Sequence, residues 1–311
     1  MGSILRPLFI SASRSSRAEQ LVRSSPLTQP LVSRFVAGET FAAARATAER
    51  LARKGLLVTY DHLGEAVADE AAVRSVVEEY KTYFAVAARG SHFSLKLSQL
   101  GLSVRESLAE ESLSTLCTDA ARYDHHLRVD MEESATIDAT LRLVEAARPH
   151  GGDPGVVIQA MLRRAPDLLQ WAIDRDVRVR LVKGAYKEPE AVAYQGREPV
   201  RRAYLALLGP LLAKSRAPAV ATHDDVLLGG AAQIAAQFDR PYEVQFLYGV
   251  REDLAQQIAR RGIPVRIYTP FGDAWYPYFM RRLAERPQNV GFFLRQVMDR
   301  TQDNGGRTEG R

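Results

Sequence analysis

The stretch from Gly155 to Tyr186, GVVIQAMLRRAPDLLQWAIDRDVRVRLVKGAY, contains the strand–helix–strand order on which the expected fold depends. The runs GVVIQAML and VRVRLVKGAY are short segments of strand type, and the run PDLLQWAIDRD between them has a helical pattern. A strand, a helix and a second strand in this order indicate a parallel pair with the helix packed outside the sheet.

The same order recurs on both sides of this unit. From about Glu39 onward, each helical segment is followed by a short run of strand type, which makes about eight strands. Asp69 and Ser134 are predicted to cap two of the helices. Eight such units over roughly 230 residues favour an α/β fold, a closed (β/α)8 barrel of the TIM type. A doubly wound sheet is the alternative, but no G-x-G-x-x-G follows the first strand and no Walker-type loop occurs.

The chain is expected to divide into an N-terminal arm over residues 1–38, the barrel over residues 39–300, and a disordered polar tail over residues 301–311. The first 35 residues are rich in Ser and Arg and nearly free of acidic side chains. Three prolines, at positions 7, 26 and 30, interrupt any long amphipathic helix there. We therefore expect a loosely structured arm with helical segments.

The composition, with 46% hydrophobic and 25% charged residues, is typical of a soluble globular protein. The net charge is +5, but the basic residues are spread along the chain, which disfavours a nucleic-acid partner. The single cysteine, Cys117, excludes an internal disulfide and indicates a reducing compartment. No apolar run reaches the ~18 residues of a membrane helix. We therefore expect a cytoplasmic protein.

Polar side chains recur on one face of the predicted strands. Strand side chains alternate between two faces, so the apolar set is expected to pack against the helices and the polar set to point into the barrel. Barrel interiors are usually apolar, and burying a lone charge costs several kcal/mol. A functional site at the C-terminal mouth is therefore predicted. The alternative is a structural core in which the charged side chains pair with one another. The polar set comprises Asp61, Lys96, Asp130, Gln159, Arg180 and Tyr268.

The run from Pro264 to Glu285, PVRIYTPFGDAWYPYFMRRLAE, joins the last predicted strand to a helix through a Pro-Gly turn. Tyr278 precedes Arg281 and Arg282 by three and four positions, so these three side chains can approach one patch of surface. Guanidinium groups bind carboxylates bidentately. The pattern therefore predicts a clamp for a small carboxylate, and a solvated surface helix is the alternative.

A metal site and a Schiff-base lysine are the other kinds of site that a barrel mouth could contain. The six histidines show no H-E-x-x-H or His-Cys spacing, so no metal site is predicted. A Schiff-base lyase or aldolase is the rival enzyme class, because a desolvated lysine at a barrel mouth can be a nucleophile. Lys96 or Lys183 would then form the adduct.

The segments VRLVKGAY (Val179 to Tyr186), ATHD (residues 221–224) and RIYTPFGDAWYPYFMRR (residues 266–282) resemble those of proline dehydrogenases, specifically the short monofunctional bacterial form. The similarity extends from Arg34 to Arg295. It implies a distorted barrel with FAD at its mouth, oxidation of L-proline to 1-pyrroline-5-carboxylate, and transfer of the electrons to a quinone. It also implies a separate pyrroline-5-carboxylate dehydrogenase as the next enzyme. Because quinones are lipid-soluble, peripheral association with the inner face of the membrane is compatible with this resemblance.

The same resemblance assigns roles to individual residues. Asp130 and Arg180 are expected to be catalytic, with Arg180 close to the flavin N5 that accepts the hydride. Tyr268 is expected to fill the space that a 4-hydroxyl group on the substrate would need. The residues expected to contact proline are Lys96, Tyr186, Leu247, Tyr268, Tyr278, Arg281 and Arg282. The residues expected to hold FAD are Met131, Gln159, Arg180, Lys183, Gly184, Ala185, Thr222 and His223.

Overall fold

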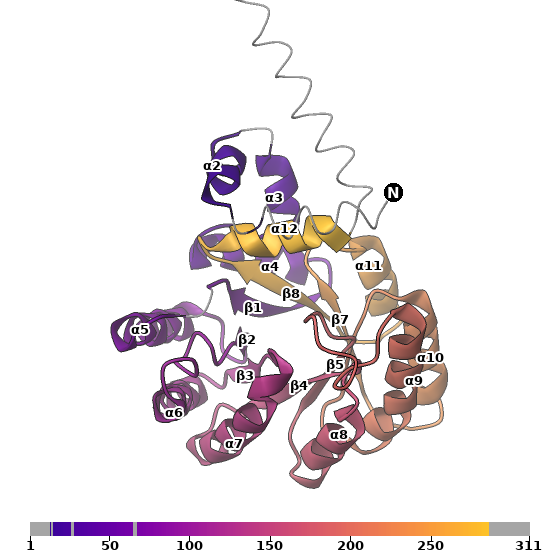
Figure 1. Cartoon of the computed structure of the whole chain (residues 1–311). Coiled ribbons are helices and arrows are strands. Elements are labelled where there is room, and N and C mark those ends of the chain that lie inside the picture. The colour runs from indigo at the N-terminus through magenta and orange to yellow at the C-terminus, as the bar shows by residue number, and fades with distance from the viewer. Residues whose placement is uncertain (1–12, 14, 26–27, 65–66, 286–311) are drawn as a thin grey trace, which may run out of the picture.

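The protein is described here by a computed structural model that covers residues 13, 15–25, 28–64 and 67–285. Eight parallel strands form a closed barrel in the order of the sequence, with β8 paired to β1 (Figure 1). The predicted (β/α)8 barrel is therefore confirmed. The strands are β1 (Leu57–His62), β2 (His92–Leu95), β3 (His126–Val129), β4 (Gly155–Gln159), β5 (Val179–Val182), β6 (Ala219–Ala221), β7 (Glu243–Leu247) and β8 (Val265–Phe271).

Helices surround this barrel on the outside (Figure 1). They are α4 (Phe41–Ala52), α5 (Glu70–Val86), α6 (Glu106–Arg122), α7 (Ile137–Ala147), α8 (Ala165–Asp174), α9 (Arg197–Lys214), α10 (Asp225–Ala235) and α11 (Glu252–Arg260), with two short 3-10 turns, η1 (Ser134–Thr136) and η2 (Arg148–His150). Apolar strand residues such as Phe93, Leu95 and Val129 are buried against these helices. The helix cap predicted at Asp69 is confirmed, because its Oδ1 accepts a hydrogen bond from Ala72 N at 2.9 Å.

The helix cap predicted at Ser134 was wrong. Ser134 begins the short turn η1, and α7 starts only at Ile137. Both the backbone N–H and the hydroxyl of Ser134 donate to the carboxylate of Glu188, at 2.7 and 2.6 Å. Ser134 therefore donates to a distant carboxylate, whereas a capping serine would accept a hydrogen bond from a backbone N–H group of its own helix.

The described part of the N-terminal arm is helical. Residues of the arm form α2 (Ser16–Ser24) and α3 (Gln29–Phe35), and these helices pack against α12 (Trp275–Glu285). Pro30 lies in the first turn of α3, where the missing N–H group is tolerated. The apolar side chains of the arm therefore have a partner helix far away in the sequence. The disorder expected for residues 301–311 lies outside the described residues.

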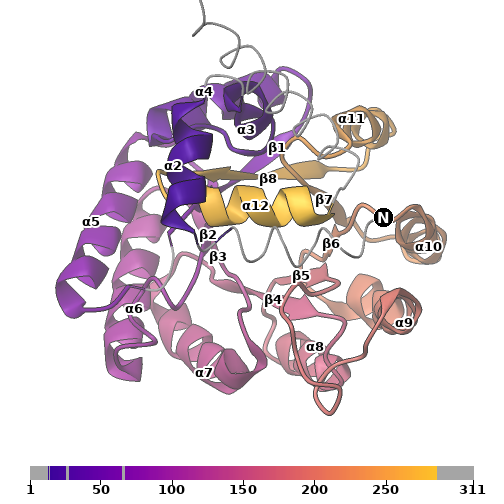
Figure 2. The same ribbon diagram turned by 45° about the horizontal axis from the view of Figure 1, so that its top comes forward.

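The helix after β8 departs from the regular barrel. The outer position between β8 and β1 is covered by α4, which precedes β1 and contacts both strands. Helix α12 lies across the mouth instead (Figure 2). It shares a second hydrophobic core with Leu63 and Val250, which follow β1 and β7 at the carboxyl ends of those strands. This arrangement places the residues of α12 above the end of the barrel where the polar side chains gather.

Candidate functional site

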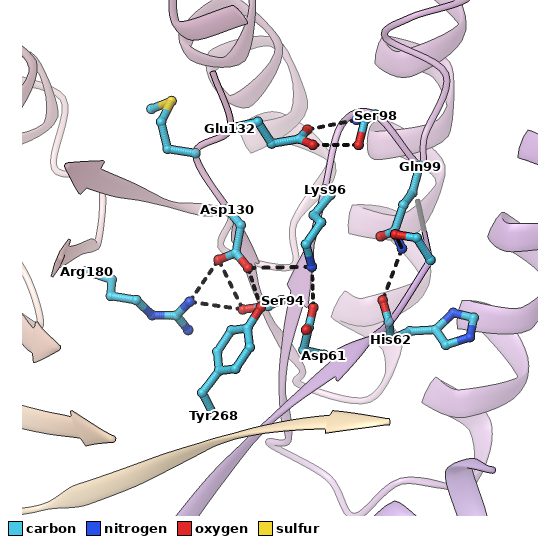
Figure 3. Close-up of polar contacts among 12 residues, drawn as sticks. Asp61, His62, Ser94, Lys96, Ser98, Gln99, Asp130, Glu132, Arg180 and Tyr268 are labelled. Atoms are coloured by element: carbon cyan, nitrogen blue, oxygen red, sulfur yellow. Dashed lines mark hydrogen bonds and ion pairs between the residues drawn. The ribbon is translucent and has the colours of Figure 1, made fainter. Parts of the chain in front are cut away.

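Five side chains from five strands or strand ends form what we call the mouth cluster, drawn in Figure 3. Its members are Asp61, Lys96, Asp130, Arg180 and Tyr268. The period-two pattern of the strands directs them into the barrel, because the apolar residues beside them in the sequence, such as Leu95, Val129 and Ile267, lie in the core under the helices. Every member is paired with another member, so the interior charges expected from the sequence occur together.

Lys96 joins the two carboxylates of this cluster. Its Nζ lies 2.6 Å from Oδ1 of Asp61 and 4.0 Å from Oδ2 of Asp130. Burial opposes the charged form of Lys96, but the two carboxylates outweigh it and hold the lysine pKa above its ordinary value. Burial also raises the pKa of Asp61, and the Lys96 ammonium limits that rise. Lys96 is therefore a charged group at the working pH.

Asp130 accepts hydrogen bonds from three side chains, those of Arg180, Tyr268 and Ser94, and the contact with Ser94 is the longest at 3.4 Å. Its Oδ1 accepts from Arg180 Nη1 at 2.8 Å, and its Oδ2 accepts from the Tyr268 hydroxyl at 2.7 Å. The Arg180 guanidinium also lies over the Tyr268 ring, 5.2 Å from its centroid. Burial, followed by the charge of Asp130, raises the pKa of Tyr268 well above its ordinary value. The phenol therefore stays protonated and donates to the carboxylate.

The side chains of the mouth cluster differ in their exposure to solvent. The side chain of Asp61 is 1% exposed, whereas those of Lys96 and Asp130 are 20% and 15% exposed. One cation and one carboxylate thus face the open end of the barrel above a buried counter-charge. Such a pair complements a small zwitterion, because each of its charges meets a group of opposite sign.

Two carboxylates, those of Glu132 and Glu188, hold loops at the mouth of the barrel in place. They were not among the residues predicted from the sequence. Glu132 accepts from both the N–H and the hydroxyl of Ser98, at 2.9 and 2.6 Å (Figure 3). Glu188 holds Ser134 in the same way. Glu132 lies two positions after Asp130. The only signal in the sequence that could have identified it is the two-residue alternation of the strand, continued beyond the end of β3.

Six of the eight residues predicted to hold a cofactor lie on β5 or at the ends of β3, β4 and β5. Gln159 Nε2 donates to the backbone oxygen of Glu132 at 2.8 Å, and a weaker contact reaches Met131. Lys183 Nζ contacts Asp224 at 2.7 Å. Burial acts in the opposite direction, but hydrogen bonds from Lys183 and Arg201 lower the pKa of Asp224 to about 2.

Gly184 follows Lys183 with φ = +108°, a conformation that favours glycine. A Cβ atom at this position would lie 2.5 Å from Met161 Sδ. The turn after β5 therefore packs closely on the turn after β4, and Ala185 beyond it is exposed.

The ends of β6 and β7 contribute three of the predicted residues. The hydroxyl of Thr222 is buried and accepts from Asp224 N at 3.2 Å. Leu247 N donates to Nε2 of His223 at 3.0 Å, so that ring nitrogen is an acceptor. Leu247 is also paired with Tyr268 in the β7–β8 register. These contacts connect the predicted cofactor residues to the mouth cluster.

Helix α12 carries the predicted arginine pair. Arg281 is exposed, whereas Arg282 is half-buried with its guanidinium 5.2 Å from the centroid of the buried Tyr278 ring. Burial, followed by the charge of Glu132, raises the pKa of Tyr186 to about 12, and Arg281 acts on the same phenol in the opposite direction. Arg281 and two members of the mouth cluster, Lys96 and Asp130, thus act on one side chain.

The described part of the chain offers neither a metal-binding cluster nor a membrane-spanning helix. No group of three or more His, Cys, Asp or Glu side chains there is arranged to hold a metal ion. None of the described helices combines the length and apolarity that a membrane span requires.

Comparison with known sequences gives a consistent result. Residues 44–295 match the family model described as proline dehydrogenase. The chain is 36% identical over 301 residues to proline dehydrogenase 1 of Bacillus subtilis, with 95% of this chain and 99% of that protein covered. It is 31% identical over 306 residues to proline dehydrogenase of Deinococcus radiodurans, with 95% and 98% covered. These alignments extend further than the segment from Arg34 to Arg295 over which the motifs indicated a resemblance.

Solved structures share the architecture. The crystal structure of proline utilization A (PutA) from Bdellovibrio bacteriovorus, inactivated by N-propargylglycine, superposes with a TM-score of 0.75 at 22% sequence identity. The match covers 86% of this chain and 33% of that chain, so this chain spans about a third of the larger protein. At this identity the likeness concerns the fold.

Proposed function

Since the chain belongs to the proline dehydrogenase family, we propose that it oxidises L-proline to 1-pyrroline-5-carboxylate, with FAD as the hydride acceptor and a quinone as the oxidant of the reduced flavin. The observation that carries this proposal is the mouth cluster, which presents Lys96 and Asp130 at the carboxyl ends of the strands beneath α12. Active sites of this fold lie at that end of the barrel.

The residues at the mouth fit a flavin. The amide oxygen of Gln159 is buried without a hydrogen-bond partner among the described residues. An unmet buried acceptor costs about 1–3 kcal/mol, and the N–H group of a flavin ring would satisfy it. Lys183, with the glycine turn that follows it, offers a cation and backbone N–H groups of the kind that bind phosphates. Met131, Ala185, Thr222 and His223 complete the set that would hold the cofactor.

The chain's own residues would bind and orient proline. The carboxylate is the only strongly charged handle that remains once the amine is neutral, so Arg281 and Arg282 would fix its position, with Lys96 nearby. Tyr186, Tyr268, Tyr278 and Leu247 would form walls around the ring. Bound flavin supplies the acceptor for the hydride.

Asp130 and Arg180 are the proposed catalytic pair. Their contact at 2.8 Å fixes both groups at the level of the Tyr268 hydroxyl. A guanidinium held in place before the reaction can stabilise negative charge as it develops on an acceptor nearby. In the same scheme the Asp130 carboxylate lies beside the bound substrate.

The Schiff-base alternative finds less support. A nucleophilic lysine must be neutral, whereas the surrounding carboxylates hold the pKa of Lys96 above its ordinary value. The other candidate, Lys183, is paired with Asp224 at 2.7 Å. Both amines therefore act as charged hydrogen-bond donors.

The test is the visible spectrum of the purified chain before and after anaerobic addition of L-proline. A yellow protein whose flavin absorbance bleaches with proline is the expected result. A colourless protein that takes up no FAD would refute the proposal, and a substrate adduct trapped by borohydride would favour the lyase. Re-oxidation of the bleached protein by a soluble quinone tests the proposed acceptor.

The remaining parts of the proposal concern the surroundings of the enzyme. We propose that a separate pyrroline-5-carboxylate dehydrogenase consumes the product. Peripheral contact with the inner face of a membrane would give access to a lipid-soluble quinone. Co-sedimentation with lipid vesicles, measured with and without a quinone in the lipid, tests that contact.

A further inference from the structure

Gln245 lies inside the barrel on β7, directly below the mouth cluster, and is 5% exposed. Its Oε1 accepts from Arg180 Nε at 2.6 Å. Its Nε2 donates to Oε1 of Glu243 at 2.5 Å. The amide is thus hydrogen-bonded on both sides, with a cation at its acceptor oxygen and a carboxylate at its donor nitrogen.

The lower part of this chain of hydrogen bonds is also tightly fixed. Both carboxylate oxygens of Glu243 accept from Arg266 Nε, at 2.9 and 3.0 Å. Arg266 Nη1 in turn donates to the backbone oxygen of Val58 on β1, at 2.8 Å. Gln245 therefore contacts an ion pair whose side chains are 9% and 20% exposed and which is attached to the barrel wall. Its amide cannot turn over without losing both of its contacts.

The neutrality of the amide matters for Arg180. The Arg180 side chain is 5% exposed, and one carboxylate, that of Asp130, lies within hydrogen-bond distance of it among the described residues. A carboxylate at position 245 would compete for the guanidinium, because arginine pairs bidentately with carboxylates. An amide holds Nε by a hydrogen bond and leaves the net charge of the guanidinium in place.

We propose that Gln245 is a positioning residue of the oxidation reaction: it holds the Arg180 guanidinium in a fixed direction through a neutral acceptor, and thereby sets the reduction potential of the flavin. This inference rests on the proposed function, since it requires flavin bound beside Arg180. Gln245 does not touch the substrate in this scheme, so its loss should affect kcat and leave the KM for proline nearly unchanged.

The experiment uses the full chain loaded with FAD and compares Gln245→Met, Gln245→Glu and the control Thr269→Val. Thr269 is fully buried on β8, and its hydroxyl donates to Ile267 O at 3.1 Å, outside the Gln245 chain. The measurements are kcat, KM for proline, the midpoint potential of the flavin, and Tm. Gln245→Met tests the loss of the acceptor, and Gln245→Glu tests a charged acceptor of nearly the same size.

The expected result for Gln245→Met is a fall in kcat of roughly ten- to a hundredfold, the usual effect of removing the partner that orients a functional group. Gln245→Glu should make the flavin potential more negative by about 30 mV, the two-electron equivalent of a tenfold change in the equilibrium constant. Thr269→Val should lower Tm while kcat and the potential keep their wild-type values. If the wild-type chain is yellow and reduced by proline but both Gln245 variants match Thr269→Val, this inference is overturned and the proposed function stands. A wild-type chain that takes up no flavin would overturn both.

Discussion

The substitution Lys96→Met examines the charge pair at the centre of the site. In the wild-type protein Lys96 Nζ lies 2.6 Å from an Asp61 carboxylate that is 1% exposed. Removing one partner of a buried ion pair costs about 3–5 kcal/mol, because the other charge is left unpaired. The Lys96 side chain is 20% exposed, so water reaches the site and we expect the lower end, about 3 kcal/mol. For a chain of 311 residues that corresponds to a fall in Tm of about 5 °C.

The loss should depend on pH with a definite sign. Burial raises the pKa of Asp61, and Lys96 is the group that most strongly limits that rise. In Lys96→Met the folded-state pKa of Asp61 therefore lies further above its unfolded value. A group of this kind contributes stability below its unfolded pKa and loses that contribution as pH rises through the folded pKa. The variant should become less stable as pH rises above the ordinary aspartate pKa of about 4.

The matched control is Asp61→Asn combined with Lys96→Met, which removes the unpaired charge and keeps the shape of the side chain. Urea unfolding of the flavin-loaded proteins at several pH values measures the free energy of unfolding. We expect the double variant to recover more than half of the loss and to show no dependence on pH between pH 5 and 8 beyond that of the wild type. If Lys96→Met loses less than about 1 kcal/mol, or if the double variant is no more stable, the two side chains do not form the buried pair on which the site depends.

Three further predictions concern other parts of the site. Arg281→Met should raise the KM for proline by roughly ten- to a hundredfold, since a charge-assisted hydrogen bond is worth about 1.5–3 kcal/mol; flavin should stay bound in the absorbance spectrum, and its loss would mean that the arginine clamp is misassigned. Tyr268→Ser should open space beside Asp130 and raise turnover of 4-hydroxyproline relative to proline, and unchanged relative turnover would reject the proposed wall. Gly184→Ala would place a methyl group 2.5 Å from Met161 Sδ at φ = +108°, a strain of about 1–3 kcal/mol. We expect a lower Tm and weaker retention of FAD on desalting, and the close packing of the two turns would be refuted by a variant that behaves as the wild type.

Part of the site follows from the sequence alone. The alternation of helical and strand-type runs indicates a parallel sheet, because each helix must return the chain to the same end of the sheet. The count of about eight strands then favours a closed barrel over a doubly wound sheet. The strand period of two then directs Asp130, Arg180 and Tyr268 into the interior, and their positions near strand ends direct them to the mouth. These are local properties, so they can be read without knowing which strands are neighbours.

Other features depend on contacts between distant segments. The pairing of Lys96 with Asp61 and the two-sided bonding of Gln245 are set by barrel closure and register, which no local pattern contains. The predicted cap at Ser134 failed for the same reason, since the carboxylate of Glu188 reaches it from another loop.

The position of α12 is the clearest example of a feature that tertiary packing determines. Its sequence is that of an amphipathic helix, which is equally suited to the outside of the barrel or to its mouth. Helix α4 occupies the outer position between β8 and β1, and the apolar residues of α2 and α3 cover α12 above the mouth. The sequence therefore determined which residues point into the barrel. Packing of the N-terminal arm against α12 decided which helix lies over the mouth. The physical reason is that burial of apolar surface depends on partners far away in the sequence, which no segment specifies alone.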